Sequence, residues 1–297
     1  MSEEMTRNVL DLHTHSTASD GIHTPSELVR LAHEASLGRI GLVDHDTTDG
    51  LAEALAAGEH YDVVVVPGVE INTDLSGRHG EVHVLGYYIE YNRPPFQQAL
   101  AMLRNAREQR GEKMVARLRE QGLDVTWERV RELAHGAVGR PHVAAALIEK
   151  GYASDVSDAF DKYLAPGRSG YVPRYKLSPA DAVRLIKSAR GVPVLAHPLG
   201  IPDMEREVLP ELVIIGLQGL ECYYGQYLPT DVEHLLELAE TYHLVPTGGS
   251  DYHGPNMHPT PLGGRYVPME CAERLERLAH FNHRIPAPDF QLPEPEA

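Results

Sequence analysis

The chain has 297 residues and a formal net charge of -16 at pH 7, from 43 acidic against 27 Lys and Arg side chains. This charge argues against broad electrostatic adhesion to duplex DNA, although a local basic cleft could hold a nucleotide or a single strand. Hydrophobic residues make up 42% of the chain, and no apolar run approaches the roughly 20 residues that span a bilayer. We therefore expect neither a membrane nor duplex DNA among its partners.

The cysteine content and the first residues both indicate a compartment. The opening residues, MSEEMTRN, lack the basic and then apolar pattern of a secretory signal. Only two cysteines occur, Cys222 and Cys271, and they are far apart in the sequence. These features favour a reducing cytoplasm.

Short β-rich runs alternate with amphipathic segments of helical spacing. The expected strands are 9–12, 40–43, 63–66, 82–89, 192–196, 217–223 and 244–247, and clear helices are expected at 26–35, 179–189 and 231–242. Pro or Ser/Thr stands near the helix starts, as is common at the first helical turn. The alternation predicts an α/β fold with a mainly parallel sheet or barrel, which can reach this length as one unit with an insertion.

The strand-helix rhythm breaks after Tyr91. Residues 94–170 are rich in Arg, Glu, Ala and Leu, as in AMLRNAREQRGEKMVARLREQG, and show no clear strand. We interpret them as a helical insertion domain, so that the barrel domain is discontinuous and spans 1–93 and 171–284. The tail, 285–297, is proline-rich and acidic, and we expect it to lie over the surface or to be disordered.

Histidines and carboxylates recur where the expected strands end. His13 and His15 follow a strand two residues apart, so alternation points both imidazoles to the same side. Further ligand-type residues follow later strands, where barrels carry their chemistry: His45, Glu70, His197, Asp251 and His253. His83 lies inside EVHVLGYY and Asp20 lies in the loop STASDGIHT. Six His and three carboxylates suit two or three divalent ions bridged by a carboxylate.

Each of these residues also has a structural alternative. An H-x-H pair alone could be two strand histidines that bind backbone groups, and His83 could be a buried, hydrogen-bonded residue. Asp20 precedes Gly21, where Asp often serves in a turn. Glu221 and Tyr223 end a strand at the same rim, where pocket lining and packing are equally compatible with the pattern.

The ordered strings DLHTHSTASDG, GLVDHDTTDG, VPGVEI, VHVLGYY, VLAHP and GGSDYHG resemble the polymerase and histidinol phosphatase (PHP) family. This resemblance implies a distorted (β/α)7 barrel of the PHP type with a helical insertion domain. GRPHVAAAL and AFDKYLAPGRSGYVP are similar to the insertion of one bacterial subgroup. Its members remove the 3'-phosphate from 3',5'-bisphosphonucleotides (3',5'-nucleotide bisphosphate phosphatases) or trim short RNA from its 5' end (5'-3' exoribonucleases).

The resemblance also implies a grouping of the ligands. His13, His15, Glu70 and Asp251 would hold a first ion, and Glu70 would bridge to a second that His83 and His197 complete. Asp20, His45 and His253 would hold a third. Manganese is the implied metal, although His with carboxylate also suits iron and zinc. A metal-bound hydroxide held by Glu70, His197 and Asp251 would then attack phosphorus in line, because coordination lowers the pKa of water from 15.7 to about 7.

Arginines in the insertion are the expected phosphate-binding groups. Arg140 and Arg168 lie in the segments that match the subgroup, and a guanidinium binds phosphate in a bidentate fork. His142, Tyr171 and Lys176 are weaker candidates for the same wall. Arginines of a charged helical segment are as often solvated or paired to carboxylates. We expect the insertion to cover the active site.

The expected function is therefore metal-dependent hydrolysis of the 3'-phosphate of a 3',5'-bisphosphonucleotide, with short single-stranded RNA as a further substrate. A histidinol-phosphate-like or generic PHP phosphatase is an alternative with the same chemistry. A metal-dependent amidohydrolase would use similar ligands without paired arginines. A non-enzymatic PHP-like module would be expected to lose ligands, and all nine positions here keep ligand-type residues.

Overall fold

The computed structural model describes residues 9–75, 81–134, 138–173, 176–255, 257 and 259–293. The chain divides into two compact units, one formed by 1–99 with 176–297 and the other by 100–175. The sequence placed the insertion at 94–170, whereas the division falls inside helix α3 (Pro94–Glu120).

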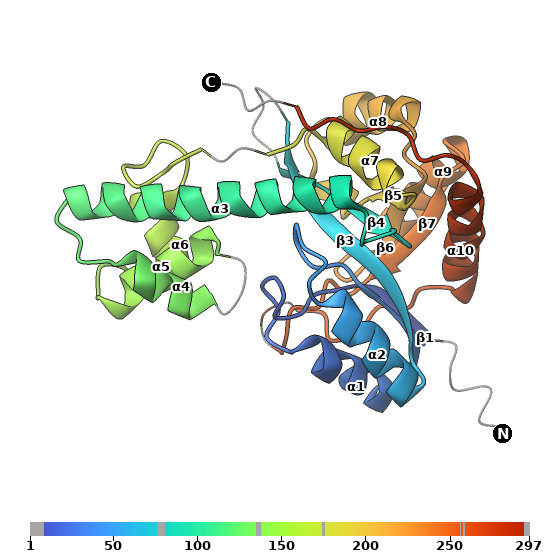
Figure 1. The fold of residues 1–297 in the computed structure, drawn as a ribbon, viewed down its shortest axis with the longest axis horizontal. Coiled ribbons are helices and arrows are strands. Elements are labelled where there is room, and N and C mark those ends of the chain that lie inside the picture. The colour runs from blue at the N-terminus through green and yellow to red at the C-terminus, as the bar shows by residue number, and fades with distance from the viewer. Residues whose placement is uncertain are drawn as a thin grey trace. The chain divides into compact units, whose positions relative to one another are not determined.

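The first unit is built on a seven-stranded sheet whose strand order follows the chain order (Figure 1). Its strands are β1 (Val9–Thr14), β2 (Leu37–Leu42), β3 (Val64–Asp74), β4 (Glu81–Tyr87), β5 (Val192–Leu195), β6 (Gly219–Tyr224) and β7 (Val245–Gly249). Strands β1 to β3 pair in parallel, as do β5 to β7. Strand β4 is antiparallel to both of its neighbours. All seven expected strands are therefore present, one of them reversed.

The first and last strands lie side by side, so the sheet curls into a nearly closed barrel. Thr14 at the end of β1 forms a parallel bridge with Tyr252, just beyond β7. The His15 amide donates to the Tyr252 carbonyl at 2.9 Å, and the Tyr252 amide donates to the His13 carbonyl at 3.3 Å. The predicted distorted barrel is confirmed, and this junction brings the two ends of the sequence's metal-ligand pattern together.

Helices flank the strands of this unit (Figure 1). They are α1 (Pro25–Glu34), α2 (Leu51–Tyr61), α7 (Pro179–Ser188), α8 (Leu209–Ile215), α9 (Pro229–Thr241) and α10 (Met269–Arg284). Thr24 and Glu27 form a reciprocal capping box around Pro25 at the start of α1. Ser178 caps α7 by accepting from the Asp181 amide. The caps satisfy amides that have no intrahelical partner, which explains why these helices begin where the sequence predicted.

The barrel core is apolar and continues into α10. Leu10, Leu12 and Tyr87 are fully buried and belong to one cluster with Leu275 and Ala279 of α10. The Tyr87 hydroxyl donates to the Leu12 carbonyl at 2.9 Å. Full burial of each of these leucines contributes about 1.5–3 kcal/mol. The core therefore fixes the strands whose ends bear the histidines.

The second unit has its own core and consists of helices in its described residues. It contains the rest of α3, α4 (Trp127–Ala134), α5 (Arg140–Glu149), α6 (Val156–Ala159) and a π-helical turn, Phe160–Leu164. Leu118, Val130, Val143, Leu147 and Leu164 are buried in one cluster. The expected helical character of the insertion is confirmed. Across the described parts of both units, every helix is too short or too polar to cross a membrane.

Candidate metal centre

The junction of β1 and β7 supplies four of the predicted ligands. His13 lies in β1 and His15 follows it, while Asp251 and His253 follow β7. Because the two strand ends pair through Thr14 and Tyr252, these four side chains reach two adjoining groups of ligands. Asp251 has a positive φ of 57°, a region that non-glycine residues enter at a cost, often at functional sites.

One ligand lies elsewhere on its strand than the sequence indicated. Glu70 was expected at the end of its strand, but β3 continues to Asp74, because residues 68–74 pair with β4 in an antiparallel ladder. His83 lies inside β4, near its start, as the sequence indicated. Since β4 is reversed, its beginning meets the ends of its neighbours, and His83 Nδ1 lies 2.8 Å from Glu70 Oε1.

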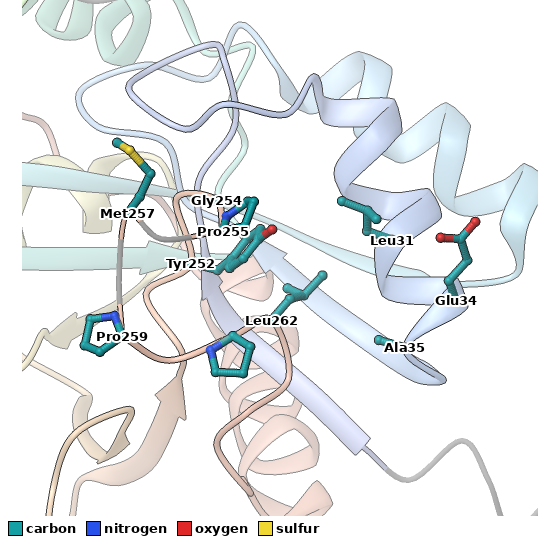
Figure 2. Close-up of a pocket in the computed structure, with 10 residues that line it drawn as sticks. Leu31, Glu34, Ala35, Tyr252, Gly254, Pro255, Met257, Pro259 and Leu262 are labelled. Carbon is teal, nitrogen blue, oxygen red and sulfur yellow. The ribbon is translucent and has the colours of Figure 1, made fainter.

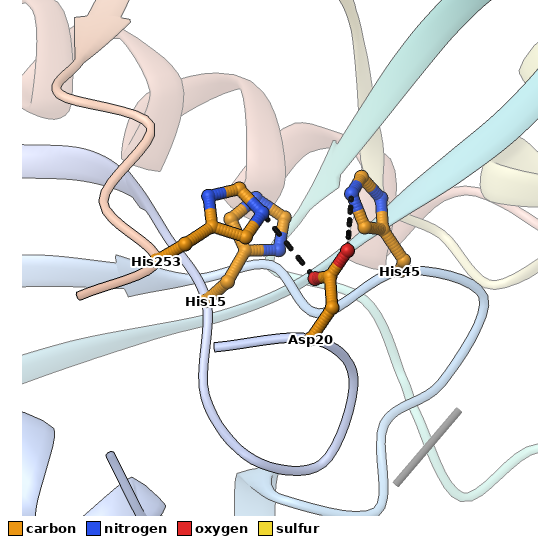
Figure 3. A group of neighbouring side chains, drawn as sticks. All are labelled: His15, Asp20, His45 and His253. Atoms are coloured by element: carbon orange, nitrogen blue, oxygen red, sulfur yellow. Dashed lines mark ion pairs between the residues drawn. The ribbon is translucent and has the colours of Figure 1, made fainter. Parts of the chain in front are cut away.

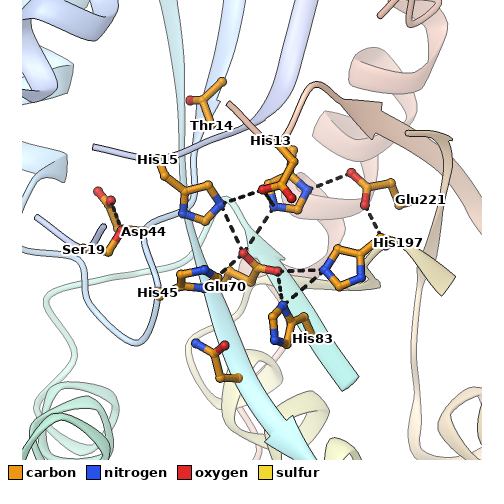
Figure 4. Close-up of polar contacts among 12 residues, drawn as sticks. His13, Thr14, His15, Ser19, Asp44, His45, Glu70, His83, His197 and Glu221 are labelled. Atoms are coloured by element: carbon orange, nitrogen blue, oxygen red, sulfur yellow. Dashed lines mark hydrogen bonds and ion pairs between the residues drawn. The ribbon is translucent and has the colours of Figure 1, made fainter. Parts of the chain in front are cut away.

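The first group of ligands is compact and buried (Figure 4). Nε2 of His13 and Nε2 of His15 each lie 3.2 Å from Glu70 Oε2 and 3.2 Å from Asp251 Oδ1. Four atoms placed 2.0–2.1 Å from a tetrahedral ion lie about 3.3 Å from one another. The donor atoms of this group therefore have the spacing that a divalent ion requires.

The second carboxylate oxygen of Glu70 faces another pair of histidines. Glu70 Oε1 lies 2.8 Å from His83 Nδ1 and 3.4 Å from His197 Nε2. The two histidine nitrogens are 3.2 Å apart. His45 also contributes here, with Nδ1 at 3.2 Å from Glu70 Oε2. The structure thus adds His45 to the group that the resemblance assigned to Glu70, His83 and His197.

The third group surrounds Asp20, the most exposed of the nine (Figure 3). Its carboxylate lies 3.3 Å from His253 Nε2 and 3.7 Å from His45 Nε2. His15 also belongs to this group and stacks on His253, with ring centroids 4.1 Å apart. His45 faces the second group through Nδ1 and the third through Nε2, so the three groups adjoin.

Several donor atoms in these groups make no hydrogen bond of regular geometry among the described residues, although three of them lie 3.2–3.3 Å from a carboxylate or an imidazole. They are both ring nitrogens of His15, Nδ1 of His45, Nε2 of His83 and Oδ1 of Asp20. Buried polar atoms are nearly always satisfied, because an unpaired one costs about 1–3 kcal/mol. The cluster is compatible with metal binding, because bound cations would give several of these atoms a partner.

The cluster is strongly coupled electrostatically. Burial alone would lower the pKa of His15, but the carboxylates of Asp251 and Glu70 outweigh it and raise the pKa to about 10. Burial lowers the pKa of His45 to about 3, against the pull of Asp20 and Glu70. Burial would raise the pKa of Glu70, yet the surrounding histidines hold it well below its usual range. The buried carboxylates therefore need positive charge beside them, from protons or from metal ions.

A layer of buried carboxylates orients the ligands, and sequence reasoning largely missed it. Asp44 accepts from the Ser16 amide at 2.8 Å, the Ser16 hydroxyl at 2.7 Å and the Ser19 hydroxyl at 2.6 Å, which fixes the loop that carries Asp20. Asp11 similarly holds Ser250, next to Asp251. The sequence signal for this layer was the position of each acidic residue relative to a ligand histidine. Asp44 directly precedes His45, and Asp11 lies two residues before His13.

The predicted phosphate-binding residues divide between the units. Lys176 belongs to the first unit, where Nζ lies 2.8 Å from Glu81 Oε1, and the other Glu81 oxygen is 4.0 Å from His83 Nε2. Arg140, His142, Arg168 and Tyr171 belong to the second unit, and their substrate role stays a prediction. There the Arg140 guanidinium lies over the Phe160 ring, and His142 Nδ1 accepts from the Gly139 amide at 2.9 Å.

A separate hollow of about 880 Å³ lies between α1 and the segment that follows β7 (Figure 2). Its walls are mainly apolar and include Leu31, Ala35, Tyr252 and Leu262. Tyr252 stands between the ligands Asp251 and His253 in sequence, but none of the nine predicted ligands lines the hollow. The cluster is therefore a polar centre distinct from this pocket.

Residues 11–171 match the family model of the PHP domain. The chain belongs to the PHP domain family. It is 36% identical to the 5'-3' exoribonuclease Rnm of Salmonella typhimurium over 83% of this chain and 86% of the relative. It is 34% identical to the 3',5'-nucleoside bisphosphate phosphatase of Chromobacterium violaceum over 87% of this chain and 90% of the relative. The chain is also 34% identical to a phosphoribosyl 1,2-cyclic phosphate 1,2-diphosphodiesterase of Eggerthella lenta, over 93% of this chain and 99% of the relative.

Solved structures agree with this family. A protein from Bifidobacterium adolescentis assigned as a metal-dependent phosphoesterase superposes with a TM-score of 0.80 at 31% identity, over 91% of this chain and 96% of that one. A Chromobacterium violaceum structure described as an amidohydrolase with bound sulfate and no metal gives a TM-score of 0.78 at 31% identity. The match covers 91% of this chain and 96% of that one. The PHP resemblance and the expected class, a hydrolase of phosphate esters, are confirmed.

Proposed function

We propose that the chain is a metal-dependent phosphatase that removes the 3'-phosphate of 3',5'-bisphosphonucleotides and releases the 5'-mononucleotide. The observation that carries this proposal is the shared position of Glu70, whose two oxygens face different histidine groups. A bridging carboxylate keeps neighbouring cations close, as two-metal phosphoesterases require. Similarity to the 3',5'-nucleoside bisphosphate phosphatase, at 34% identity, supports the substrate class.

The nine ligand-type residues would hold two or three divalent ions, and manganese is the ion we expect. His13, His15, Glu70 and Asp251 would hold the first, Glu70 with His83 and His197 the second, and Asp20 with His45 and His253 the third. Bound cations would supply a nucleophile from water at neutral pH and neutralise phosphoryl oxygens. His15 and His45 each face two of these groups, but a neutral imidazole has one lone pair for a metal ion, so each would bind only one ion.

The chain's own residues have orienting roles in this reaction. The Tyr224 hydroxyl donates to Asp251 Oδ2 at 2.9 Å, which leaves Asp251 Oδ1 directed at His13 and His15. Asp20 and His197 are the more exposed ligands, with side chains 35% and 24% exposed, whereas Glu70 is 1% exposed. The substrate would therefore approach from the side of Asp20 and His197, with Glu70 at the base of the site.

A second activity, the trimming of short RNA from its 5' end, is supported by the 36% identity to the exoribonuclease Rnm. Both activities would take place in the cytoplasm. Cys222 and Cys271 are free and buried, which fits a reducing compartment.

The test compares substrates on metal-stripped protein reloaded with Mn²⁺. Adenosine 3',5'-bisphosphate, p-nitrophenyl phosphate, a short 5'-phosphorylated RNA and a carboxylic anilide would be offered at equal concentration. We expect the bisphosphate to have the highest kcat/KM and the anilide to remain intact. His13→Ala should abolish turnover, while His280→Ala, which removes an exposed histidine of α10, should not. Preferential anilide hydrolysis would favour the amidohydrolase instead.

A further inference from the structure

Glu221 lies behind the metal-ligand cluster and contacts two of its histidines. It is part of β6, and its side chain is completely buried. Its Oε1 is 2.8 Å from His13 Nδ1, and its Oε2 accepts a hydrogen bond from the His197 amide at 2.7 Å (Figure 4). A buried carboxylate with both oxygens in such contacts has a more specific role than packing.

The contact with His13 fixes which nitrogen of that imidazole is protonated. An ionised carboxylate can only accept hydrogen bonds, so Nδ1 of His13 must carry the proton. Nε2 faces Glu70 and Asp251, each 3.2 Å away, and it is the nitrogen that a metal ion would bind in place of a proton. A histidine that binds metal through one nitrogen commonly donates its other N–H to a carboxylate, which also makes the imidazole a better donor.

The contact with His197 holds a strained backbone. His197 has φ 27° and ψ 59°, outside the regions that non-glycine residues favour. The hydrogen bond from its amide to Glu221 stabilises this conformation, which turns the imidazole toward Glu70 and His83. One carboxylate thus orients ligands that belong to two different groups.

We propose that Glu221 is a positioning residue that sets the His13 tautomer and the His197 backbone for metal binding. This inference rests on the proposed metal centre. Glutamine at this position would be nearly isosteric but would offer one accepting oxygen and one donating NH₂. Either His13 Nδ1–H or the His197 amide would then lose its acceptor, whichever way the amide turned.

The test measures Mn²⁺ binding to metal-stripped protein through the EPR signal of free Mn²⁺. We expect Glu221→Gln to raise the dissociation constants of the most tightly bound Mn²⁺ ions by at least about tenfold. Changes of this size are typical when a residue that orients a metal ligand is replaced. Thr247→Val is the matched control, because Thr247 pairs with Glu221 across β6 and β7, is buried and has no hydrogen-bonding partner among the described side chains. It should bind Mn²⁺ like the native protein.

The outcomes separate this inference from the proposed centre. Native protein that binds neither Mn²⁺, Fe²⁺ nor Zn²⁺ would overturn the centre itself. Native binding with equal affinity in a folded Glu221→Gln variant would overturn only the role of Glu221. If the variant does not fold, ¹⁵N-histidine NMR of native Zn²⁺-loaded protein decides. We expect the His13 proton on Nδ1, and a proton on Nε2 would overturn the inference.

Discussion

The carboxylate of Asp11 accepts two hydrogen bonds from Ser250, at 2.9 Å from its amide and 2.5 Å from its hydroxyl. It also accepts from the Gly263 amide at 2.9 Å and the His13 amide at 3.3 Å. Asp11 is buried in β1, two residues before His13, and Ser250 directly precedes Asp251. One side chain therefore ties together two ligands of the first group that are far apart in sequence.

Asp11→Asn should destabilise the metal-free protein. The amide would place an NH₂ group against donors that now share two carboxylate oxygens, leaving at least one buried donor unsatisfied, at a cost of about 1–3 kcal/mol. Urea unfolding measures this difference. Asp289→Asn, at an exposed position after α10, should change stability by less than about 0.5 kcal/mol. Equal unfolding midpoints for native protein and Asp11→Asn would contradict the role of this junction.

Metal uptake should depend on pH through His15. Its pKa is raised to about 10, because Asp251 and Glu70 outweigh the opposite effect of burial, so the metal-free protein holds this proton at pH 7.5. A metal ion must displace it, and Mn²⁺ affinity should therefore rise as the pH increases toward 10. Calorimetry in buffers of different ionisation enthalpy would detect the released proton. Mn²⁺ affinity that is constant between pH 6.5 and 8.5 would contradict this expectation.

The same proton should stabilise the metal-free fold. The folded pKa of His15, about 10, exceeds the unfolded value of about 6.5, so the protonated form favours folding. The contribution of His15 is complete below pH 6.5 and is lost as the pH rises through 10.

Asp20→Asn should remove one ion and leave the others. Asp20 supplies the sole carboxylate of the group formed with His15, His45 and His253, and its side chain is 35% exposed at the edge of the cluster. An amide is a weaker ligand for a hard divalent cation than a carboxylate. Metal analysis after gel filtration in Mn²⁺ buffer should show one ion fewer per chain. An unchanged ion count would show that these four residues hold no ion.

Arg140→Ala should raise KM for adenosine 3',5'-bisphosphate more than KM for p-nitrophenyl phosphate. The expected reason is loss of a bidentate guanidinium contact to the second phosphate. Arg129→Ala is a suitable control, because Arg129 is an exposed arginine of the same unit whose partners are Glu132 and Glu149. An equal change in both KM values would remove Arg140 from the recognition of the bisphosphate.

The strands were predictable because they follow local rules, and the nine residues expected to bind metal lie close together in the structure. A β-rich run ending in His or Asp indicates a strand end, and the pairing of β1 with β7 then brings His13 to Asp251. The reversal of β4 was not predictable, because strand direction depends on which neighbours pair. For the same reason the sequence placed Glu70 at a strand end, although β3 continues beside β4 to Asp74.

The supporting carboxylates depend on contacts that are distant in sequence. Asp11 and Ser250 are 239 positions apart, and Glu221 is 208 positions from His13. The local sequence around an acidic residue in a strand does not show whether its side chain faces outward or contacts a metal ligand. From the sequence, Glu221 was equally compatible with lining the pocket and with packing. In the structure it contacts His13 and the His197 amide.

The most direct test of the account is the hydrolysis of adenosine 3',5'-bisphosphate in H₂¹⁸O by metal-stripped protein reloaded with Mn²⁺. We predict adenosine 5'-monophosphate and inorganic phosphate as products, with one ¹⁸O in the phosphate and none in the nucleotide, because water attacks phosphorus. His13→Ala should release no phosphate. An inert native protein, loss of the 5'-phosphate, or ¹⁸O in the nucleotide would contradict the proposed 3'-phosphatase.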